Sequence, residues 1–385
     1  MQAFTFSTAK SVVFRPGAAA ELAEVAGTLL GAKVLLVTDA GIRQLGLVDP
    51  ALQSLVAAGH DVAVFDGVEA DPSQATLIRA VAAGRAHGAT GVVGFGGGSS
   101  LDVAKLAALL LGSGEDLDGA WGLGNAKGPR LPLVLVPTTA GTGSEVTPIS
   151  IITVGADEKR GVSSAILLPD IAVLDADLTL GLPPAITAAT GMDAMVHAIE
   201  AFTSTSANNN PLSQNLAREA LRLLGANIET AVHQGDDVAA RAAMLLGSML
   251  AGQAFANSPV AAVHALAYPI GGTFHVPHGL SNALVLPHVL RFNAPVSAPL
   301  YADLAPLVFP ALAEFPADQR CEAFIAELEL LATRLALPTR LRDVGIPESA
   351  VSKMAADAMK QQRLLVNNPR PVTEADAHAI YTAAW

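Results

Sequence analysis

The chain has 385 residues, of which 51% are hydrophobic and 15% charged, enough for two domains that each bury a core. Its formal net charge of −12 is spread along the sequence, and Lys and Arg form no basic cluster, which argues against nucleic acid as a partner. A single cysteine, Cys321, excludes an intrachain disulfide and a thiolate metal cage, and because the first residues lack the layout of a signal peptide we expect a cytoplasmic protein.

Short apolar runs alternate with helical segments from about residue 32 onward. The runs are rich in β-branched residues and read AKVLLVT, HDVAVFDGV, ATGVVGF and LPLVLVP, with Ala- and Leu-rich segments such as ATLIRAVAAGRA between them. Continuous apolar strands that alternate with helices are typical of a parallel sheet covered on both faces. We therefore expect an α/β domain in the first half of the chain.

The second half has a different periodicity. Strand signals stop after LLPDIAVLDADLTLGLPP, and segments such as NLAREALRLLGANIETAVHQ place apolar residues three and four positions apart. The change falls at Pro183 and Pro184, a pair that suits a helix start or a linker. We predict an α/β domain over residues 1–182 and an all-helical domain over residues 183–385.

Between Arg241 and Arg291 the chain contains no Asp, Glu, Lys or Arg. Histidine, asparagine, proline and glycine interrupt this interval, so no apolar run approaches the roughly 20 residues that a membrane span needs. We interpret the interval as the buried centre of the helical domain and expect no membrane partner.

A glycine-rich loop joins a strand to a helix in TGVVGFGGGSSLDVAKLAALLL. Ser99 or Ser100 can cap the helix, and Asp102 is expected in its first turn. The three glycines, 96–98, let the backbone approach a ligand, and the helix N-terminus suits a pyrophosphate. The motif is neither the alternating-glycine dinucleotide fingerprint nor a Walker loop, so a tight turn without a ligand is the alternative.

A second loop, PTTAGTGSEVT, follows the next strand and offers the hydroxyls of Thr138, Thr139, Thr142 and Ser144. In open α/β sheets the ligand crevice lies at the carboxyl ends of the strands, so both loops are expected to border one site. Asp39, at the end of KVLLVTD, can bind a ribose hydroxyl and repel a 2′-phosphate, which favours NAD over NADP. A turn-forming aspartate is the alternative for this residue.

The segment GMDAMVHAIEAFTS places Asp193 and His197 four residues apart, on one face of a helix, where both can bind one ion. A lone histidine on an apolar face is more often a hydrogen-bonded core residue. Here, however, four of the nine histidines fall within 25 positions, namely His264, His275, His278 and His288. Three imidazoles and one carboxylate suit Fe(II) or Zn(II) better than Mg or Ca, although spacing leaves open which three histidines bind.

In these motifs and their order, the chain resembles the iron-containing (group III) alcohol dehydrogenases, which include lactaldehyde (propanediol) reductases, butanol dehydrogenases and maleylacetate reductases. The resemblance covers nearly the whole chain and rests on the segments GGGSSLDVAK, PTTAGTGSEVT, LLPDIAVLDADLTLGLPP, ATGMDAMVHAIEAFTS, HALAYPIGGTFHVPHGLSNALVLPHVLRFN and NNPRPVTEADAHAIYTAAW. It implies a dehydroquinate synthase-like architecture, in which a Rossmann-like NAD(P)-binding domain precedes a helical metal-binding domain. It also implies hydride transfer between NAD(H) and a small primary alcohol or aldehyde whose oxygen binds Fe(II) or Zn(II).

The resemblance further assigns roles by position. The implied metal ligands are Asp193, His197, His264 and His278, which leaves His275 and His288 outside the ligand set. The implied cofactor-binding residues are Asp39, Gly97, Gly98, Ser99, Asp102, Thr138, Thr139, Thr142, Lys159 and Leu178. The implied substrate pocket is apolar and includes Ile149, Ile151 and Phe255.

One departure concerns proton transfer, because many members carry a second histidine four residues after the third ligand, where this chain has Tyr268. Tyr268 and His275 are therefore the catalytic candidates for the proton relay. A maleylacetate reductase or a hydroxyacid–oxoacid transhydrogenase is the alternative function and requires a pocket cation, for which Lys159 and Arg370 are candidates. A non-redox metal enzyme is a further alternative. The high apolar content favours a homo-oligomer, a dimer or larger.

Overall fold

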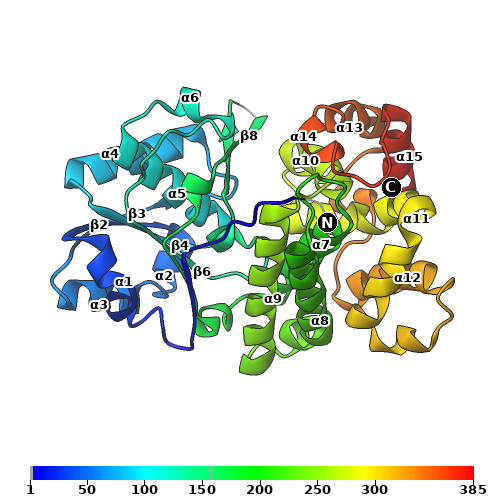
Figure 1. Ribbon diagram of the computed structural model, residues 1–385, viewed down its shortest axis with the longest axis horizontal. Coiled ribbons are helices and arrows are strands. Elements are labelled where there is room, and N and C mark those ends of the chain that lie inside the picture. Colours follow the sequence, from blue (N-terminus) through cyan, green and yellow to red (C-terminus); the bar gives the residue numbers. More distant parts are fainter. Residues whose placement is uncertain (1–2, 156–157) are drawn as a thin grey trace. The chain divides into compact units, whose positions relative to one another are not determined.

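The computed structural model describes residues 3–155 and 158–385. The chain divides into two compact units (Figure 1). The α/β unit contains Ser7–Thr139 and Gly143–Leu180, and the helical unit contains the residues up to Phe6, Ala140–Thr142 and Gly181–Trp385. The expected order, a parallel sheet with helices followed by an all-helical part, is confirmed.

A six-stranded parallel sheet forms the centre of the α/β unit, in the order β1-β9-β6-β4-β2-β3. Its strands are β1 (Ser11–Phe14), β2 (Lys33–Asp39), β3 (Asp61–Val68), β4 (Gly91–Gly96), β6 (Leu133–Pro137) and β9 (Ile171–Leu174). The four apolar runs expected to be strands correspond to β2, β3, β4 and β6. The edge strand β1 escaped sequence analysis because it has only four residues and none of them is fully buried.

Helices cover both faces of this sheet because its strands are apolar on both sides. In β2, Leu35 and Val37 join one core cluster with α4 (Gln74–His87) and α5 (Gly98–Ser113), whereas the alternate residues Val34 and Leu36 join another with α1 (Leu22–Leu30) and α3 (Asp49–Ala57). All four of these β2 side chains are fully buried. Each contributes roughly 1.5–3 kcal/mol of transfer free energy.

A second, three-stranded sheet in the α/β unit was not expected. It has the order β5-β8-β7, in which β7 (Ile149–Val154) pairs antiparallel with β8 (Glu158–Ser163) and β5 (Gly122–Leu123) pairs parallel with β8. The polar sequence EKRGVS of β8 gives no strand signal. The short elements of this unit are α2 (Ala40–Gln44), α6 (Leu117–Ala120), η1 (Ser144–Val146), η2 (Ala165–Leu167) and η3 (Ala176–Thr179).

The first long helix of the helical unit begins at the proline pair: Pro183 is the N-cap of α7 and Pro184 is its first helical residue, a position where the missing N–H costs no hydrogen bond. Its α-helices are α7 (Pro184–Thr203), α8 (Pro211–His233), α9 (Val238–Asn257), α10 (Ala262–Phe274), α11 (His278–Val308), α12 (Arg320–Arg334), α13 (Val351–Ala358), α14 (Gln362–Leu365) and α15 (Glu374–Ala384). Single 3-10 turns are η4 (Pro310–Glu314), η5 (Leu341–Val344) and η6 (Glu348–Ala350).

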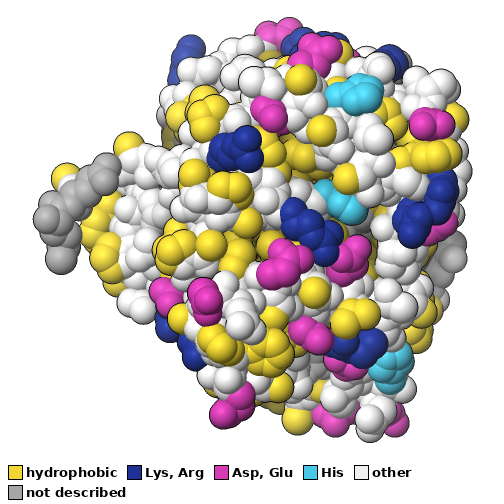
Figure 2. All heavy atoms as spheres, turned by 90° about the vertical axis from the view of Figure 1, so that its right-hand side faces the viewer, with side chains coloured by type: hydrophobic (Ala, Val, Ile, Leu, Met, Phe, Trp, Pro, Cys, Tyr) yellow, Lys and Arg dark blue, Asp and Glu magenta, His cyan; other side chains and the backbone are white. Residues whose placement is uncertain are grey.

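The interval without charged residues runs from α9 into α11 and is largely buried. Within the described residues, α9 alone has the length and composition of a membrane-spanning helix, with a mean hydropathy of 1.3. Because 61% of that apolar window is buried inside the protein, α9 fits a core helix as well. On the face drawn in Figure 2, Lys and Arg side chains lie among Asp and Glu side chains, and the described residues form no basic patch there.

Candidate functional site

Four potential metal ligands meet in the helical unit. Asp193 and His197 lie on α7, His264 lies on α10, and His278 is the first residue of α11. One ligand atom from each of the four lies within 4.8 Å of every other. The first three side chains are buried, whereas the His278 side chain is 41% exposed. Three of the four donors are therefore buried, and only His278 is exposed to solvent.

A glycine brings His278 to the cluster. A Cβ atom on Gly279 would lie 2.3 Å from the backbone oxygen of Ala189 on α7, so only glycine allows α11 to start this close to α7. Gly141 plays a similar part, because its Cβ would lie 2.7 Å from the Thr190 side chain. Its carbonyl oxygen lies 3.3 Å from Nδ1 of His197 and leaves Nε2 of that ring for an ion.

The protonation states of two of these residues suit a cation. Burial lowers the pKa of His197 to about 3, against a smaller opposite effect of Asp193, so this imidazole is neutral at pH 7. Burial also raises the pKa of Asp193, but the three imidazoles and the amide of Asn282 outweigh it, and the net pKa is below the usual value. A carboxylate and neutral imidazoles are the forms that bind metals.

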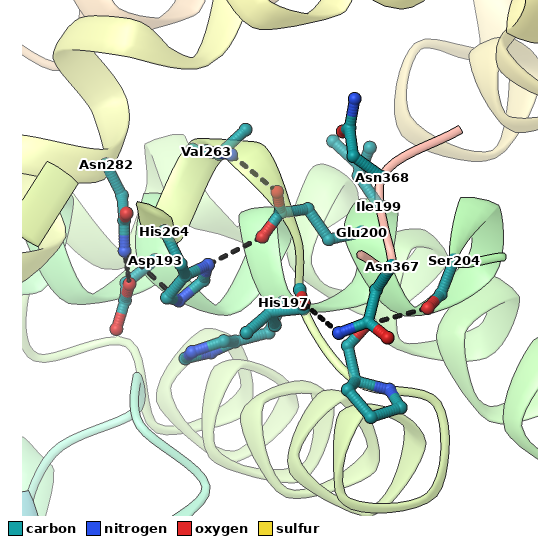
Figure 3. A network of polar contacts seen from close by, with 12 residues as sticks. Asp193, His197, Ile199, Glu200, Ser204, Val263, His264, Asn282, Asn367 and Asn368 are labelled. Atoms are coloured by element: carbon teal, nitrogen blue, oxygen red, sulfur yellow. Dashed lines mark hydrogen bonds and ion pairs between the residues drawn. The ribbon is translucent and has the colours of Figure 1, made fainter. Parts of the chain in front are cut away.

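Two residues that sequence analysis did not identify support the four donors (Figure 3). Asn282, one turn after His278, donates from Nδ2 to Oδ1 of Asp193 at 2.6 Å, and this nitrogen also lies 3.3 Å from Nε2 of His264 and of His278. Glu200, two turns after Asp193, contacts Nδ1 of His264 at 2.6 Å. A D-x3-H-x2-E pattern was visible in the sequence, but the partner of Glu200 was not.

The residue types and their positions fit a divalent metal ion. Three imidazole nitrogens and one carboxylate oxygen form the mixed donor set that Zn(II) and Fe(II) take in proteins. A buried acceptor atom at the cluster, Oδ1 of Asn282, has no hydrogen-bond partner among the described residues. The helical unit can therefore hold such an ion with Asp193, His197, His264 and His278.

Two further side chains adjoin the donors, and a third candidate, His275, lies at the end of α10. Phe255 of α9 stacks on His197, with ring centroids 4.3 Å apart. Tyr268 of α10 lies with its ring centroid 6.1 Å from that of His278, and Arg363 donates to its hydroxyl at 3.2 Å. His275 ends α10 in a left-handed conformation with φ 55°, and its side chain is exposed.

In the α/β unit, the glycine loop follows β4 and leads into α5. The expected cap is wrong: Gly97, not Ser99 or Ser100, is the N-cap, and Asp102 lies beyond the first turn, because the helix already begins at Gly98. No side chain of the described residues caps α5 at Gly97. A Cβ on Gly97 would meet nothing closer than 3.7 Å, so the first-turn amides remain approachable for a ligand.

The other expected loop lies beside this one, as the adjacent positions of β2, β4 and β6 in the sheet require. The amide of Thr138 donates to the Gly96 carbonyl at 3.0 Å, and Thr139 lies next to Gly97. Asp39 caps α2 through its side chain, while its other oxygen lies 3.5 Å from the Ser100 hydroxyl. These residues thus converge at the carboxyl ends of the strands and fit a dinucleotide phosphate and ribose.

A buried lysine ties α5 to the second loop. Lys105 is fully buried, and its ammonium donates to Ser144 Oγ at 2.7 Å, Thr147 Oγ1 at 3.1 Å and the Ile149 carbonyl at 2.7 Å. Asp102 accepts from Ser144 Oγ at 2.6 Å and from the Ile151 amide at 2.8 Å. The sequence places Lys105 one turn after Asp102 but does not show that it anchors this loop.

The remaining candidates have the following places. Ile149 and Ile151 lie on β7, Leu178 packs against a core cluster of the α/β unit, and Thr142 belongs by its contacts to the helical unit. Lys159 pairs with Asp71 at 2.6 Å, and Arg370 donates to the Phe292 carbonyl while its guanidinium lies over the Phe292 ring. His288 lies ten residues after His278 on α11, roughly 15 Å along the helix.

Comparison with known proteins gives consistent matches. The sequence model described as iron-containing alcohol dehydrogenase matches residues 9–176, and that described as Fe-containing alcohol dehydrogenase family, C-terminal, matches residues 187–385. The chain is 43% identical over 367 residues to long-chain-alcohol dehydrogenase 1 of Geobacillus thermodenitrificans, which covers 92% of this chain and 90% of that protein.

Two solved structures are similar over almost their full length. A 1,3-propanediol oxidoreductase superposes with a TM-score of 0.96 at 36% identity, covering 100% of both chains. The sulfoacetaldehyde reductase of Bifidobacterium kashiwanohense, solved in complex with NAD+, superposes with a TM-score of 0.87 at 26% identity, covering 100% of this chain and 99% of the other.

Proposed function

Because the chain belongs to the iron-containing alcohol dehydrogenases and is an oxidoreductase of that family, we propose that it transfers a hydride between NAD(H) and a small primary alcohol or aldehyde, in a reaction that requires Fe(II) or Zn(II). The observation that carries the proposal is the convergence of one carboxylate and three imidazoles in the helical unit. NAD rather than NADP is supported by the carboxylate of Asp39 beside the glycine loop, since a 2′-phosphate would be repelled there.

The roles of the residues follow from their chemistry. Asp193, His197, His264 and His278 hold the ion, which when bound supplies Lewis acidity toward the substrate oxygen. Phe255 covers one face of His197 and excludes water from it. Tyr268 or His275 holds the exchanged proton. The assignment of Phe255, Ile149 and Ile151 to an apolar substrate pocket is kept as the family resemblance implies it.

The cofactor is assigned to the loops at the carboxyl ends of the sheet. The first-turn amides of α5 and small hydroxyls bind phosphate and ribose oxygens, while Asp102 fixes the loop geometry through Ser144. The assigned residues are Asp39, Gly97, Gly98, Ser99, Asp102, Thr138, Thr139, Thr142, Lys159 and Leu178.

One observation favours a second substrate class, carbonyl compounds that carry an anionic group, such as the acids that a maleylacetate reductase or a hydroxyacid–oxoacid transhydrogenase accepts. Arg363 is exposed, lies with its guanidinium carbon 5.8 Å from the Tyr268 ring centroid, and donates to the Tyr268 hydroxyl. A guanidinium at this edge of the cluster can bind a carboxylate or a sulfonate. Lys159 and Arg370, the cations considered from the sequence, are engaged elsewhere.

The test is NADH oxidation by protein stripped of metal and then reconstituted separately with Fe(II) and Zn(II). The substrates are short aldehydes, sulfoacetaldehyde, succinic semialdehyde and 2-oxoacids. Reduction of aldehydes that depends on added metal supports the proposal, whereas inactivity with every metal despite NADH binding contradicts it. If the R363L variant loses activity only toward the anionic aldehydes, these are the substrates. If R363L keeps the same fraction of wild-type activity toward anionic and neutral aldehydes, this second class is eliminated.

Three expectations from the sequence remain proposals. We propose a domain boundary between residues 182 and 183, a cytoplasmic location, with which the single cysteine is consistent, and a homo-oligomer, a dimer or larger. Light scattering of the purified protein measures the last of these directly.

A further inference from the structure

Glu200 is a buried carboxylate that contacts a donor of the cluster without being one of the four. Only 4% of its surface is exposed, and it lies on α7 seven residues after Asp193 and three after His197, on the same helix face. A buried ionised carboxylate is costly unless it is paired and hydrogen-bonded. Its contacts therefore indicate what it stabilises.

Both oxygens of Glu200 face a donor. Oε2 lies 2.6 Å from Nδ1 of His264, and Oε1 accepts the backbone N–H of Val263 at 2.7 Å. The two donors belong to consecutive residues at the start of α10, so one side chain of α7 holds both the Val263 backbone and the ring of His264, which faces the cluster (Figure 3).

The other nitrogen of His264 faces the cluster. Figure 3 shows the His264 ring between Glu200 on one side and Asp193 with Asn282 on the other. Nε2 of His264 lies 3.3 Å from the amide nitrogen of Asn282, which can donate only to an unprotonated ring nitrogen. Both contacts fit the same tautomer, with the proton on Nδ1 and the lone pair of Nε2 directed into the cluster.

We propose that Glu200 is a positioning residue for metal binding, which sets the tautomer and orientation of His264 and increases the affinity of the cluster for a divalent cation. A carboxylate behind a ligating imidazole raises the basicity of the ligand nitrogen. The inference rests on the proposed metal dependence of the enzyme.

The variant Glu200→Gln separates this role from simple packing. A carboxylate accepts from both donors, but an amide of the same size has only one acceptor oxygen. If the glutamine oxygen accepts the N–H of Val263, the amide NH2 faces Nδ1 of His264. Nδ1 must then be unprotonated, so the ring proton moves to Nε2, where it prevents metal binding. If the glutamine oxygen instead accepts from Nδ1 of His264, the amide NH2 faces the backbone N–H of Val263, and two donors oppose each other.

The experiment measures Zn(II) affinity of the full-length protein by competition with a chromophoric chelator at one pH. E200Q is expected to raise the Kd for Zn(II) about 10- to 100-fold. E200D, which keeps the charge on a shorter side chain, is expected to lose less. The matched control is E219Q, because Glu219 is a salt-bridged carboxylate on the surface of the same unit, and its Kd is expected to change by less than about twofold.

A second measurement is made on the wild-type protein and does not depend on how well E200Q folds. Nitrogen NMR of the metal-free, histidine-labelled wild-type protein, with the His264 signals assigned by their loss in H264Q, reports which ring nitrogen carries the proton. A proton on Nδ1 supports the inference, and one on Nε2 overturns it. Equal Zn(II) affinities of wild type and E200Q also overturn it. If the wild-type protein binds no metal at all, the proposed function fails first, so the two failures are distinguishable.

Discussion

The Lys105→Met substitution tests whether the buried ammonium anchors the loop between β6 and β7. Burial lowers the pKa of this lysine, but four acceptors lie within hydrogen-bonding distance of its nitrogen, including the Asp102 carboxylate at 3.4 Å, and only the charged form has three donor hydrogens to share among them. Methionine has a similar volume and leaves the acceptors on Ser144, Thr147 and Ile149 without their donor. Each buried group left unsatisfied costs about 1–3 kcal/mol, and loss of one partner of a buried ion network about 3–5 kcal/mol. Because burial of the apolar methionine side chain carries little desolvation cost, we expect the free energy of unfolding to fall by about 3–5 kcal/mol.

Urea unfolding with tryptophan fluorescence measures this loss. The chain has two tryptophans, Trp121 in the α/β unit and Trp385 in the helical unit, so a W385F background leaves a single reporter in the unit that contains Lys105. The control is K127M, the same chemical change at an exposed lysine of the same unit, which we expect to stay within about 0.5 kcal/mol. K105M should also weaken NADH binding. A K105M protein as stable as K127M, with unchanged NADH affinity, would refute the anchoring role.

Three further predictions concern single residues. Burial raises the pKa of Glu145 from 4.5 to about 7, so ionisation of this carboxyl lowers the free energy of unfolding progressively as the pH rises through that interval. In urea titrations, E145Q should abolish this pH dependence and should be more stable than the wild type by up to roughly 3 kcal/mol at about pH 8. Parallel pH profiles of the two proteins would contradict this prediction. Gly279→Ala should displace His278 because its Cβ meets Ala189, and Zn(II) affinity should fall at least tenfold, as tested by chelator competition. Tyr268→Phe should lower kcat for aldehyde reduction about 100-fold with NADH affinity unchanged, and normal turnover would remove Tyr268 from the proton relay.

The sequence by itself determined the architecture, because local patterns encode it. Apolar runs buried on both faces read as strands of a covered parallel sheet, and β2, β3, β4 and β6 lie where these runs are. The loss of strand signals and the proline pair at 183–184 located the first helix of the helical unit. The pairing of β7 with β8 could not be predicted from the sequence, because a polar strand such as EKRGVS is stabilised by hydrogen bonds to its partner strand and shows no alternating apolar pattern of its own.

At the candidate site, spacing within one helix was sufficient for Asp193 and His197, since a separation of four residues places both on one face. Helix packing decided the rest. The approach of α11 to α7 at Gly279 brings His278 to the cluster, whereas His275 caps the end of α10 and His288 lies farther along α11. Glu200 and His264 are 64 residues apart, and Lys105 reaches acceptors 39 or more residues away. Such contacts depend on which helix faces meet, and only the tertiary structure specifies that, because burial of whole faces determines it and no local pattern records it.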